Sequence, residues 1–350
     1  IDQTSFLKDL EGLPKTEFLS VSGYMKKLEK ELSGRLPLWS GELYLELHRG
    51  TLTSIPEIKK GNRLAETALR EAEIAGVLVN KPASFFEGIW KKLLINQFHD
   101  ILPGSSINEV NERTIAELEE VRREAGKMTE DALTSLCVQQ EGTVSFFNPT
   151  PYPLMRTFRT ELPDGFIPEN AVIQTSETLD GRSYTAVAGL TLSPLGLTSR
   201  KKAPSPAPVT ESPFRFEGHT LETPLLRIEF DKEMRIVRWF DKQLKSELVQ
   251  RGGVFNRFLC GESLPLKYDN WEIERDQASC MKDDGKLISC AKVSDGPLEF
   301  RLRTVRKIGF GSELKQDMIF FADRAEAEFE TVVNWREEHS LLKAAFETNL

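Results

Sequence analysis

The chain has 350 residues, of which 39% are hydrophobic and 29% charged, and its formal net charge is -8. This length predicts two or three compact domains, and the composition is that of a folded chain rather than a disordered one. The negative charge excludes a basic surface that could bind nucleic acid or an anionic membrane. No apolar stretch approaches the ~20 residues that span a bilayer, so we expect no membrane segment.

The N-terminus and the cysteines indicate the cellular context. The sequence begins Ile-Asp-Gln-Thr, without the features of a signal peptide, and we expect it to be part of a longer chain. The four cysteines are isolated and far apart, which argues against a cysteine-based zinc site and against a disulfide framework. A reducing cytoplasm is therefore the expected location.

Side chains alternate between two types over 41–50, which predicts a strand. Its core-facing side would carry Leu43, Leu45 and Leu47, and its opposite side Glu42, Tyr44, Glu46 and His48. Two carboxylates, a phenol and an imidazole on one face require water, a ligand or a partner charge to cover them. A solvated edge strand is the simplest interpretation of this pattern.

Three amphipathic helices are expected next, each introduced by a serine with a glutamate three residues later. These pairs, which are typical of capping boxes, are Ser54 and Glu57, Ser84 and Glu87, and Ser106 and Glu109. The first helix is expected to end near Asn80, the second at Pro103-Gly104 and the third near Leu136. Short connections between them predict an antiparallel three-helix bundle over 54–140.

From about Thr143 the spacing of apolar residues changes to two, which predicts a mainly antiparallel β-sandwich over 141–350. Strands are expected at 143–147, 298–306, 317–322 and 327–335, with a hairpin at 225–230 and 235–240. The proline-rich segment 204–213 is expected to be a linker or a surface loop. The fold class is therefore multidomain α + β.

Histidines are few enough to be weighed individually. His219 and His339 lie in polar contexts that flank strands, and we expect surface or structural roles for both. His99 lies beside Asp100 at a helix end, where the carbonyl groups favour a nearby positive charge, a metal ion included. A single His-Asp pair does not by itself establish a metal site.

Four segments make a functional role for His99 and Asp100 more convincing. In chain order they are 41–54, 96–106 with its Gln-x-His-Asp motif, 268–273 and 334–346. Together they resemble the α-mannosidases of glycoside hydrolase family 38, and the first segment resembles the cytosolic branch. The resemblance implies that residues 1–53 are the last part of an α/β catalytic domain. It also implies that 141–350 form an incomplete supersandwich of the galactose-mutarotase type.

The resemblance further implies a retaining, metal-dependent enzyme. A zinc ion, or often cobalt in the cytosolic branch, would be held by a His-x-Asp motif, by the nucleophilic aspartate and by a histidine matching His99. Asp100 would bind sugar hydroxyl groups. No His-x-Asp motif occurs in the 350 residues, so the nucleophile and the other ligands are expected in a preceding catalytic domain. With one imidazole alone, the fragment is expected to be inactive.

The acid/base residue and the remaining sugar contacts stay open. Glu42 or Glu46 could be the acid/base residue, or both could position sugar hydroxyl groups, and His48 is a further candidate for substrate binding. Asp269 and Trp271 could provide a hydroxyl acceptor and a stacking platform. The alternative is a tryptophan buried between sheets beside a salt-bridged aspartate.

The expected partners are an α-mannoside substrate, the rest of the polypeptide and a second copy of the enzyme in a homo-oligomer. Two other functions remain open. One is a non-catalytic carbohydrate-binding or scaffolding fragment, which need not hold a metal. The other is a bundle that serves only for protein interaction, which would leave the polar face of the 42–48 strand unexplained.

Overall fold

The computed structural model describes residues 6–7, 10–12, 16–41, 47–137, 140–204 and 211–349. The chain separates into two compact units, Ile1–Glu46 and Leu47–Leu350. In the first unit, helix α2 (Val21–Leu32) is capped by Ser20, whose hydroxyl oxygen accepts a hydrogen bond from the Gly23 amide at 3.1 Å. None of the helices in these ranges is long and apolar enough to cross a membrane.

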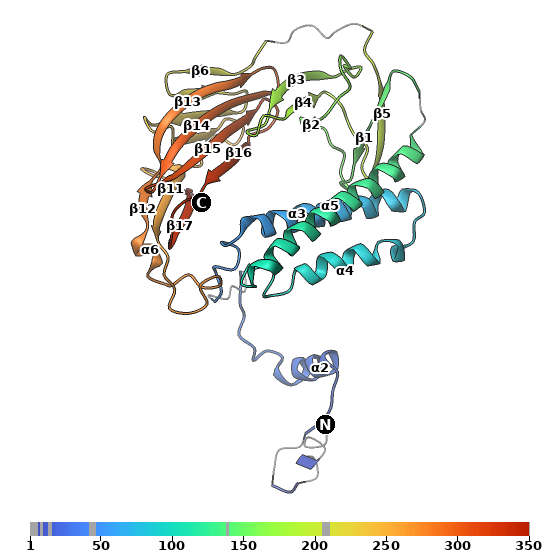
Figure 1. The fold of residues 1–350 in the computed structure, drawn as a ribbon, viewed down its shortest axis with the longest axis vertical. Helices are drawn as coiled ribbons and strands as arrows, with labels where there is room; N and C mark the ends of the chain where they lie inside the picture. Colours follow the sequence, from blue (N-terminus) through green and yellow to red (C-terminus); the bar gives the residue numbers. More distant parts are fainter. Residues whose placement is uncertain are drawn as a thin grey trace. The chain divides into compact units, whose positions relative to one another are not determined.

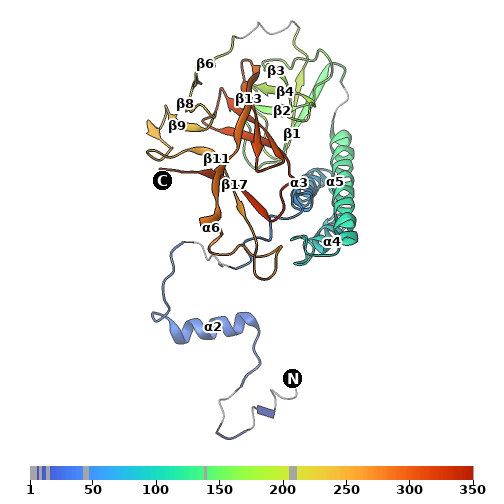
Figure 2. The same cartoon turned by 60° about the vertical axis from the view of Figure 1, so that its left-hand side comes forward.

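The second unit begins with three helices that lie side by side, coloured blue to green in Figures 1 and 2. These are α3 (Pro56–Leu78), α4 (Glu87–Asn96) and α5 (Asn108–Leu136), with a short 3-10 helix, η1 (Ala83–Phe85), before α4. Successive helices run in opposite directions (Figure 1), which confirms the antiparallel bundle. Their shared core consists of Ile58, Ala65, Leu69, Ala72, Phe86, Ile89, Leu93, Leu118, Val121 and Ala125.

The expected capping boxes are wrong. The N-cap residues of α3 and α5 are Ile55 and Ile107, and neither side chain makes a capping hydrogen bond. Helices α3 and α5 therefore begin one residue later than the boxes require, and α4, whose N-cap is Phe86, begins two residues later. Ser106 uses its hydroxyl group differently, donating to the Asp100 carbonyl oxygen at 2.7 Å. The second helix also ends earlier than expected, at Asn96, because a run of turns occupies 97–104.

The β region, shown from green to red in Figure 1, is built from antiparallel pairs in every sheet of the described residues. Two small sheets come first, β1–β5 and β2–β4–β3. Their strands are β1 (Thr143–Asn148), β2 (Phe158–Thr160), β3 (Val172–Glu177), β4 (Ser183–Ala188) and β5 (Gly196–Lys201). The expected strand at 143–147 is confirmed by β1.

A larger sheet follows in the order β12–β11–β9–β8–β7–β6, with β10 paired to β9 and β17 paired to β11. Its strands are β6 (Arg215–Glu217), β7 (Thr220–Glu222), β8 (Leu226–Phe230), β9 (Ile236–Asp241), β10 (Ser246–Glu247), β11 (Phe255–Glu262), β12 (Lys282–Asp284) and β17 (Ser340–Phe346). A short helix, α6 (Gln277–Cys280), lies between β11 and β12 in the sequence. The expected hairpin is confirmed by β8 and β9, which pair directly.

Four long strands form the other layer of the sandwich, in the order β13–β14–β15–β16. They are β13 (Lys286–Asp295), β14 (Glu299–Ile308), β15 (Ser312–Phe321) and β16 (Ala327–Asn334). The last three confirm the strands expected from alternation. Side chains of β8 and β9 pack against those of β14 and β15 in one core, so the two sheets form the expected sandwich. Most of the proline-rich segment, residues 205–210, lies outside the described residues.

A buried network of charged groups joins the β2–β4–β3 sheet to β14. The Glu299 carboxylate, which is 0% exposed, accepts hydrogen bonds from Arg159 Nε at 2.7 Å and from the Tyr184 hydroxyl at 2.6 Å. The same hydroxyl accepts a hydrogen bond from Arg301 Nη2 at 2.8 Å. Burial and the hydrogen bond to Glu299 raise the pKa of Tyr184, so the phenol stays protonated and donates.

Arg301 extends this network toward β15 and β16. Its guanidinium donates to Asp317 Oδ2 and to Glu330 Oε2, both at 2.7 Å. Burial alone would lower the pKa of Arg301, but these two hydrogen bonds and the interaction with Tyr184 together raise it. Buried charges are stable only when they are paired in this way, so the network links the β2–β4–β3 sheet to the long strands β14, β15 and β16.

Candidate functional site

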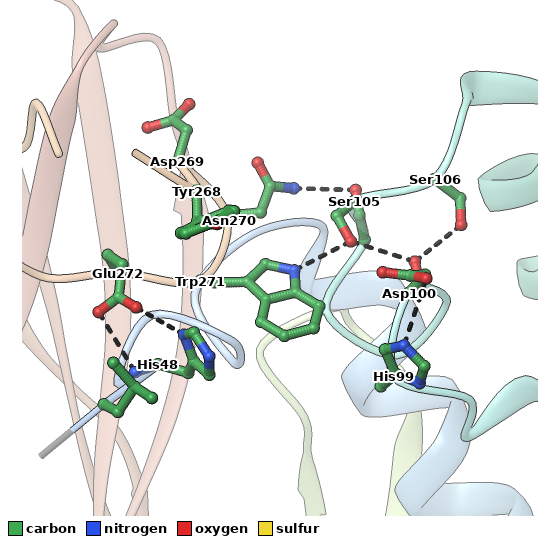
Figure 3. A pocket seen from close by; sticks show the side chains of 12 residues that line it. His48, His99, Asp100, Ser105, Ser106, Tyr268, Asp269, Asn270, Trp271 and Glu272 are labelled. Atoms are coloured by element: carbon green, nitrogen blue, oxygen red, sulfur yellow. Dashed lines mark hydrogen bonds and ion pairs between the residues drawn. The ribbon is translucent and has the colours of Figure 1, made fainter. Parts of the chain in front are cut away.

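A cavity of about 860 Å³ lies where three sequence segments of the second unit meet. Five predicted site residues line it: His48, His99, Asp100, Asp269 and Trp271. The other lining residues are Leu47, Gly104, Ser105, Ser106, Tyr268, Asn270 and Glu272. Figure 3 shows the Trp271 indole between the two imidazoles, with His48 on one side and His99 on the other. The helical bundle and the loop after β11 thus build one site together.

The loop after β11 is tied to the turn that follows α4. The Asn270 side-chain amide donates to the Gly104 carbonyl oxygen at 2.8 Å. The indole Nε1 of Trp271 donates to the Ser105 hydroxyl oxygen at 3.0 Å. Gly104 has a φ of +82°, a conformation that glycine adopts without steric cost. These two bonds set the distance between the indole and the 99–106 turn.

The same loop is tied to residues 48–50. The Gly50 amide donates to the Trp271 carbonyl oxygen at 2.7 Å, and the His48 amide donates to Glu272 Oε2 at 3.2 Å. His48 has a φ of +58°, which is incompatible with the expected strand at this position. Leu47, expected to face a core, is 60% exposed. The strand prediction is therefore wrong for 47–50.

The candidate acid/base residues Glu42 and Glu46 lie outside the described residues, as does the rest of the predicted polar face at 42–46. Of that face, only His48 has a described position. It reaches the cavity from a turn rather than from a strand.

The His48 imidazole is in contact with two residues of the β11 loop. Its Nδ1 lies 2.5 Å from Glu272 Oε1, although the N–H direction does not align with this oxygen as a hydrogen bond. The ring meets the Trp271 indole edge to face, with centroids 4.8 Å apart and planes at 88°. This packing is a favourable aromatic geometry and fixes one wall of the cavity.

His99 presents its imidazole to the cavity from the turn after α4. The side chain is 65% exposed, and Nε2 lies 3.5 Å from Asp100 Oδ2. The ring packs on Phe98 at a centroid distance of 4.2 Å and faces the edge of Trp271 at 6.1 Å. The Asp100 carbonyl oxygen accepts from the Ser106 hydroxyl, as described above, and this bond holds the turn in place. An exposed imidazole beside a carboxylate is suited to metal or hydroxyl binding.

The described residues alone do not complete a metal site. Within 6–7, 10–12, 16–41, 47–137, 140–204 and 211–349, no three or more His, Cys, Asp or Glu side chains are grouped closely enough to hold a metal ion. A zinc site needs three or four protein ligands. His99 fits the role of one ligand in its exposure and in its place in a cavity, and further ligands would have to come from elsewhere.

Trp271 and Asp269 differ in their relation to the cavity. Trp271 lies in a loop and is half-buried, so the alternative of a tryptophan buried between sheets is wrong. Asp269 is exposed, and Figure 3 shows its carboxylate directed away from the two histidines. Sequence reasoning missed Glu272, Asn270 and Ser105. Glu272 and Asn270 lie inside the segment 268–273 that resembles the family, so this segment was the available signal.

Gly50→Ala is expected to loosen the β11 loop. An added Cβ would lie 2.9 Å from the Glu272 carbonyl oxygen and 3.0 Å from the Trp271 carbonyl carbon, both of which are rigid backbone atoms. We expect the free energy of unfolding, measured in urea, to fall by about 1–3 kcal/mol. Gly88→Ala in α4 is the matched control, because nothing lies within 4 Å of its added Cβ. Equal losses of stability in the two variants would contradict this expectation.

Comparisons with known proteins place the chain in a family. Residues 46–136 match the model of the alpha-mannosidase middle domain, and residues 221–350 match the model of the C-terminal domain of glycosyl hydrolases family 38. Human alpha-mannosidase 2C1 is 28% identical over 354 residues, covering 99% of this chain and 33% of that protein. Alpha-mannosidase G from Dictyostelium discoideum is 27% identical over 398 residues, covering 98% of this chain and 36% of the relative.

The chain therefore spans about a third of the length of these curated relatives. A crystal structure of an alpha-mannosidase from Enterococcus faecalis V583 has the same fold, with a TM-score of 0.66 over 94% of this chain and 47% of that one, at 13% identity. A helical domain followed by antiparallel sheets agrees with the two matched family models in their order along the chain. The chain belongs to glycosyl hydrolase family 38, because residues 46–136 and 221–350 match that family's alpha-mannosidase middle domain and C-terminal domain.

Proposed function

We propose that these 350 residues are part of a retaining, metal-dependent α-mannosidase that removes terminal α-linked mannose from oligosaccharides or glycans. The observation that carries the proposal is the single cavity in which His99, Asp100, His48 and Trp271 meet. An indole, imidazoles and a carboxylate in one cavity suit a sugar, which offers apolar ring faces and many hydroxyl groups. Family membership supports the same reaction.

Each cavity residue has a role in this proposal. His99 would donate a ring nitrogen to a divalent metal, zinc or cobalt, and Asp100 would accept hydrogen bonds from sugar hydroxyl groups. Trp271 would provide an apolar surface for the ring, with His48 and Asp269 as further polar contacts. When bound, the metal would hold the sugar hydroxyl groups and help to distort the ring toward an oxocarbenium-like transition state.

The remaining chemistry is proposed to lie outside the described residues. The nucleophile and the other metal ligands would come from a catalytic domain encoded beyond these 350 residues, because no His-x-Asp motif occurs within them. Glu42 or Glu46 would act as acid and then base, or would position hydroxyl groups. We further propose a cytoplasmic location and a homo-oligomeric enzyme.

The 350 residues alone favour a second candidate, carbohydrate binding without catalysis. The described ranges provide an indole and polar groups around a cavity, but no grouping that could hold a metal by itself. In this case the chain would bind a mannoside without hydrolysing it. An isolated metal-ligating imidazole contributes little of the coordination energy that several ligands share.

The experiment compares the full-length parent enzyme with the 350-residue chain on p-nitrophenyl α-mannoside. We expect turnover by the parent, release of α-mannose as the first product in an NMR time course, and no turnover by the 350-residue chain. Absence of activity in the metal-loaded parent would overturn the proposed reaction. Initial release of β-mannose would overturn retention, and activity of the 350-residue chain would overturn its dependence on the further domain.

A further inference from the structure

Glu272 is a carboxylate of the cavity to which no role has yet been given. It lies on the β11 loop and contacts a residue 224 positions earlier in the chain. Its side chain is 20% exposed, so it is mostly shielded from water. We propose that Glu272 is a positioning residue, which orients the His48 imidazole so that its second ring nitrogen binds a hydroxyl group of the sugar. This inference rests on the proposed function of the cavity.

Both carboxylate oxygens of Glu272 are directed at His48. Oε2 accepts the His48 backbone N–H, and Oε1 lies beside Nδ1 of the ring at the distances given above. Nδ1 is buried and has no aligned hydrogen bond to any other group. Glu272 is therefore the charged group in contact with this side of the ring.

The backbone of His48 needs this support. A φ of +58° is uncommon for a residue other than glycine, although histidine adopts it more often than most side chains, and it is held where the surroundings stabilise it. The bond to the Glu272 carboxylate holds the His48 amide in this conformation. Without the bond, the segment could relax toward an ordinary extended backbone, which would move the imidazole away from the cavity.

Aromatic contacts limit the ring to one orientation. The imidazole meets Trp271 and Tyr268 edge to face, at centroid distances of 4.8 Å and 6.3 Å, with both interplanar angles at 88°. With Nδ1 occupied by Glu272, Nε2 is the ring nitrogen left for a ligand. When one ring nitrogen of a neutral imidazole donates its proton to a carboxylate, the other is an acceptor. Nε2 would then accept a hydrogen bond from a sugar hydroxyl group.

A double-mutant cycle in the full-length enzyme tests this role. The dissociation constant of methyl α-mannoside is measured by calorimetry for the wild type, Glu272→Gln, His48→Ala and the double variant. We expect Glu272→Gln and His48→Ala each to weaken binding by about tenfold, the effect of losing one hydrogen bond. The double variant should bind no more weakly than His48→Ala, because Glu272 acts through the imidazole.

Two further variants keep the result interpretable. Glu262→Gln changes an exposed glutamate at the end of β11 and should leave the dissociation constant unchanged. Glu272→Asp keeps the charge but shortens the side chain, and it should weaken binding while the protein stays folded, as judged by Tm. Binding within twofold of wild type in Glu272→Gln, or effects of Glu272 and His48 that multiply, would overturn the positioning role.

Failure of this inference can be told apart from failure of the proposed function. Wild-type enzyme that binds methyl α-mannoside but releases no sugar from p-nitrophenyl α-mannoside would overturn the proposed reaction, while the cycle still tests Glu272. Wild-type enzyme that turns over the substrate, with independent effects of the two substitutions, would overturn only the inference. A wild type that turns over the substrate without measurable binding of methyl α-mannoside would also contradict the inference.

Discussion

His99→Ala in the full-length enzyme is expected to remove the bound metal and abolish mannoside release together. The imidazole is 65% exposed, lines the cavity and lies beside Asp100. Changing groups that merely orient metal ligands typically costs 10–100-fold in affinity or activity, so the loss of a ligand should exceed about 100-fold. Metal content per protein after dialysis, measured by mass spectrometry, and the initial rate on p-nitrophenyl α-mannoside provide the two readouts.

His219→Ala is the matched control for this experiment. Nδ1 of His219 lies 3.1 Å from the Asp231 carbonyl oxygen, and the residue does not line the cavity. The control should retain both metal and activity. If His99→Ala retained a full complement of metal and lost only activity, the metal-binding role of this histidine would be wrong, although a role in sugar binding could remain.

Glu299→Ala is expected to cause the largest loss of stability in the β region. The side chain is 0% exposed and accepts hydrogen bonds from Arg159 and Tyr184. Its removal leaves the Arg159 guanidinium without its buried partner and takes away the acceptor of the Tyr184 hydroxyl. Breaking a buried ion pair by removing one partner typically costs about 3–5 kcal/mol. The free energy of unfolding measured in urea should fall by this amount, and the β2–β4–β3 sheet should unfold first.

Glu326→Ala provides the comparison at the surface. Glu326 lies near Arg156 at 3.5 Å and Arg324 at 3.4 Å, but its side chain is 58% exposed. Ion pairs of this kind contribute about 0–1 kcal/mol because water and salt screen them. If the two glutamate variants lost similar amounts of stability, the charged network would not be the junction that its burial indicates.

The spacing of apolar residues in the sequence correctly predicted those strands and helices in which buried and exposed side chains follow a regular period. The β8 and β9 hairpin was readable because Leu226, Ile228 and Phe230 alternate with polar residues, and all three are buried. The bundle was readable for the same reason at helical spacing. Within α3, however, Leu64 is exposed while Ala65 and Leu69 are buried. Small residues allow close packing, and this outweighs the hydrophobicity of a single leucine.

Strand β13 escaped prediction because its residues are mostly exposed, so alternation leaves no clear trace in the sequence. Its pairing with β14 also shifts register twice, between Leu287 and Ser289 and between Lys292 and Ser294. Such irregularities interrupt the period of two on which strand prediction depends. The serine-glutamate pairs before the helices led to the opposite error. The local pattern was present, but it does not form capping boxes, and Ser106, for example, donates instead to the Asp100 carbonyl oxygen.

For the site, the family resemblance pointed to His99, Asp100 and Trp271, and all three line one cavity. Their roles in binding stay predictions. The contact between His48 and Glu272 joins residues 224 positions apart, and no single sequence specifies such a pair. The pattern at 41–50 also misled, since the left-handed backbone at His48 depends on bonds to a loop much later in the chain.

The tie between Asn270 and Gly104 bears on how the protein is made. These two residues are 166 positions apart, and ribosomes add about 5–20 residues per second, so roughly 8 to 33 seconds separate their synthesis. During that interval the nascent bundle already carries His99, but the wall that contains Trp271 does not yet exist. A metal-loading step that required the finished cavity would therefore have to wait until the loop carrying Trp271 had emerged.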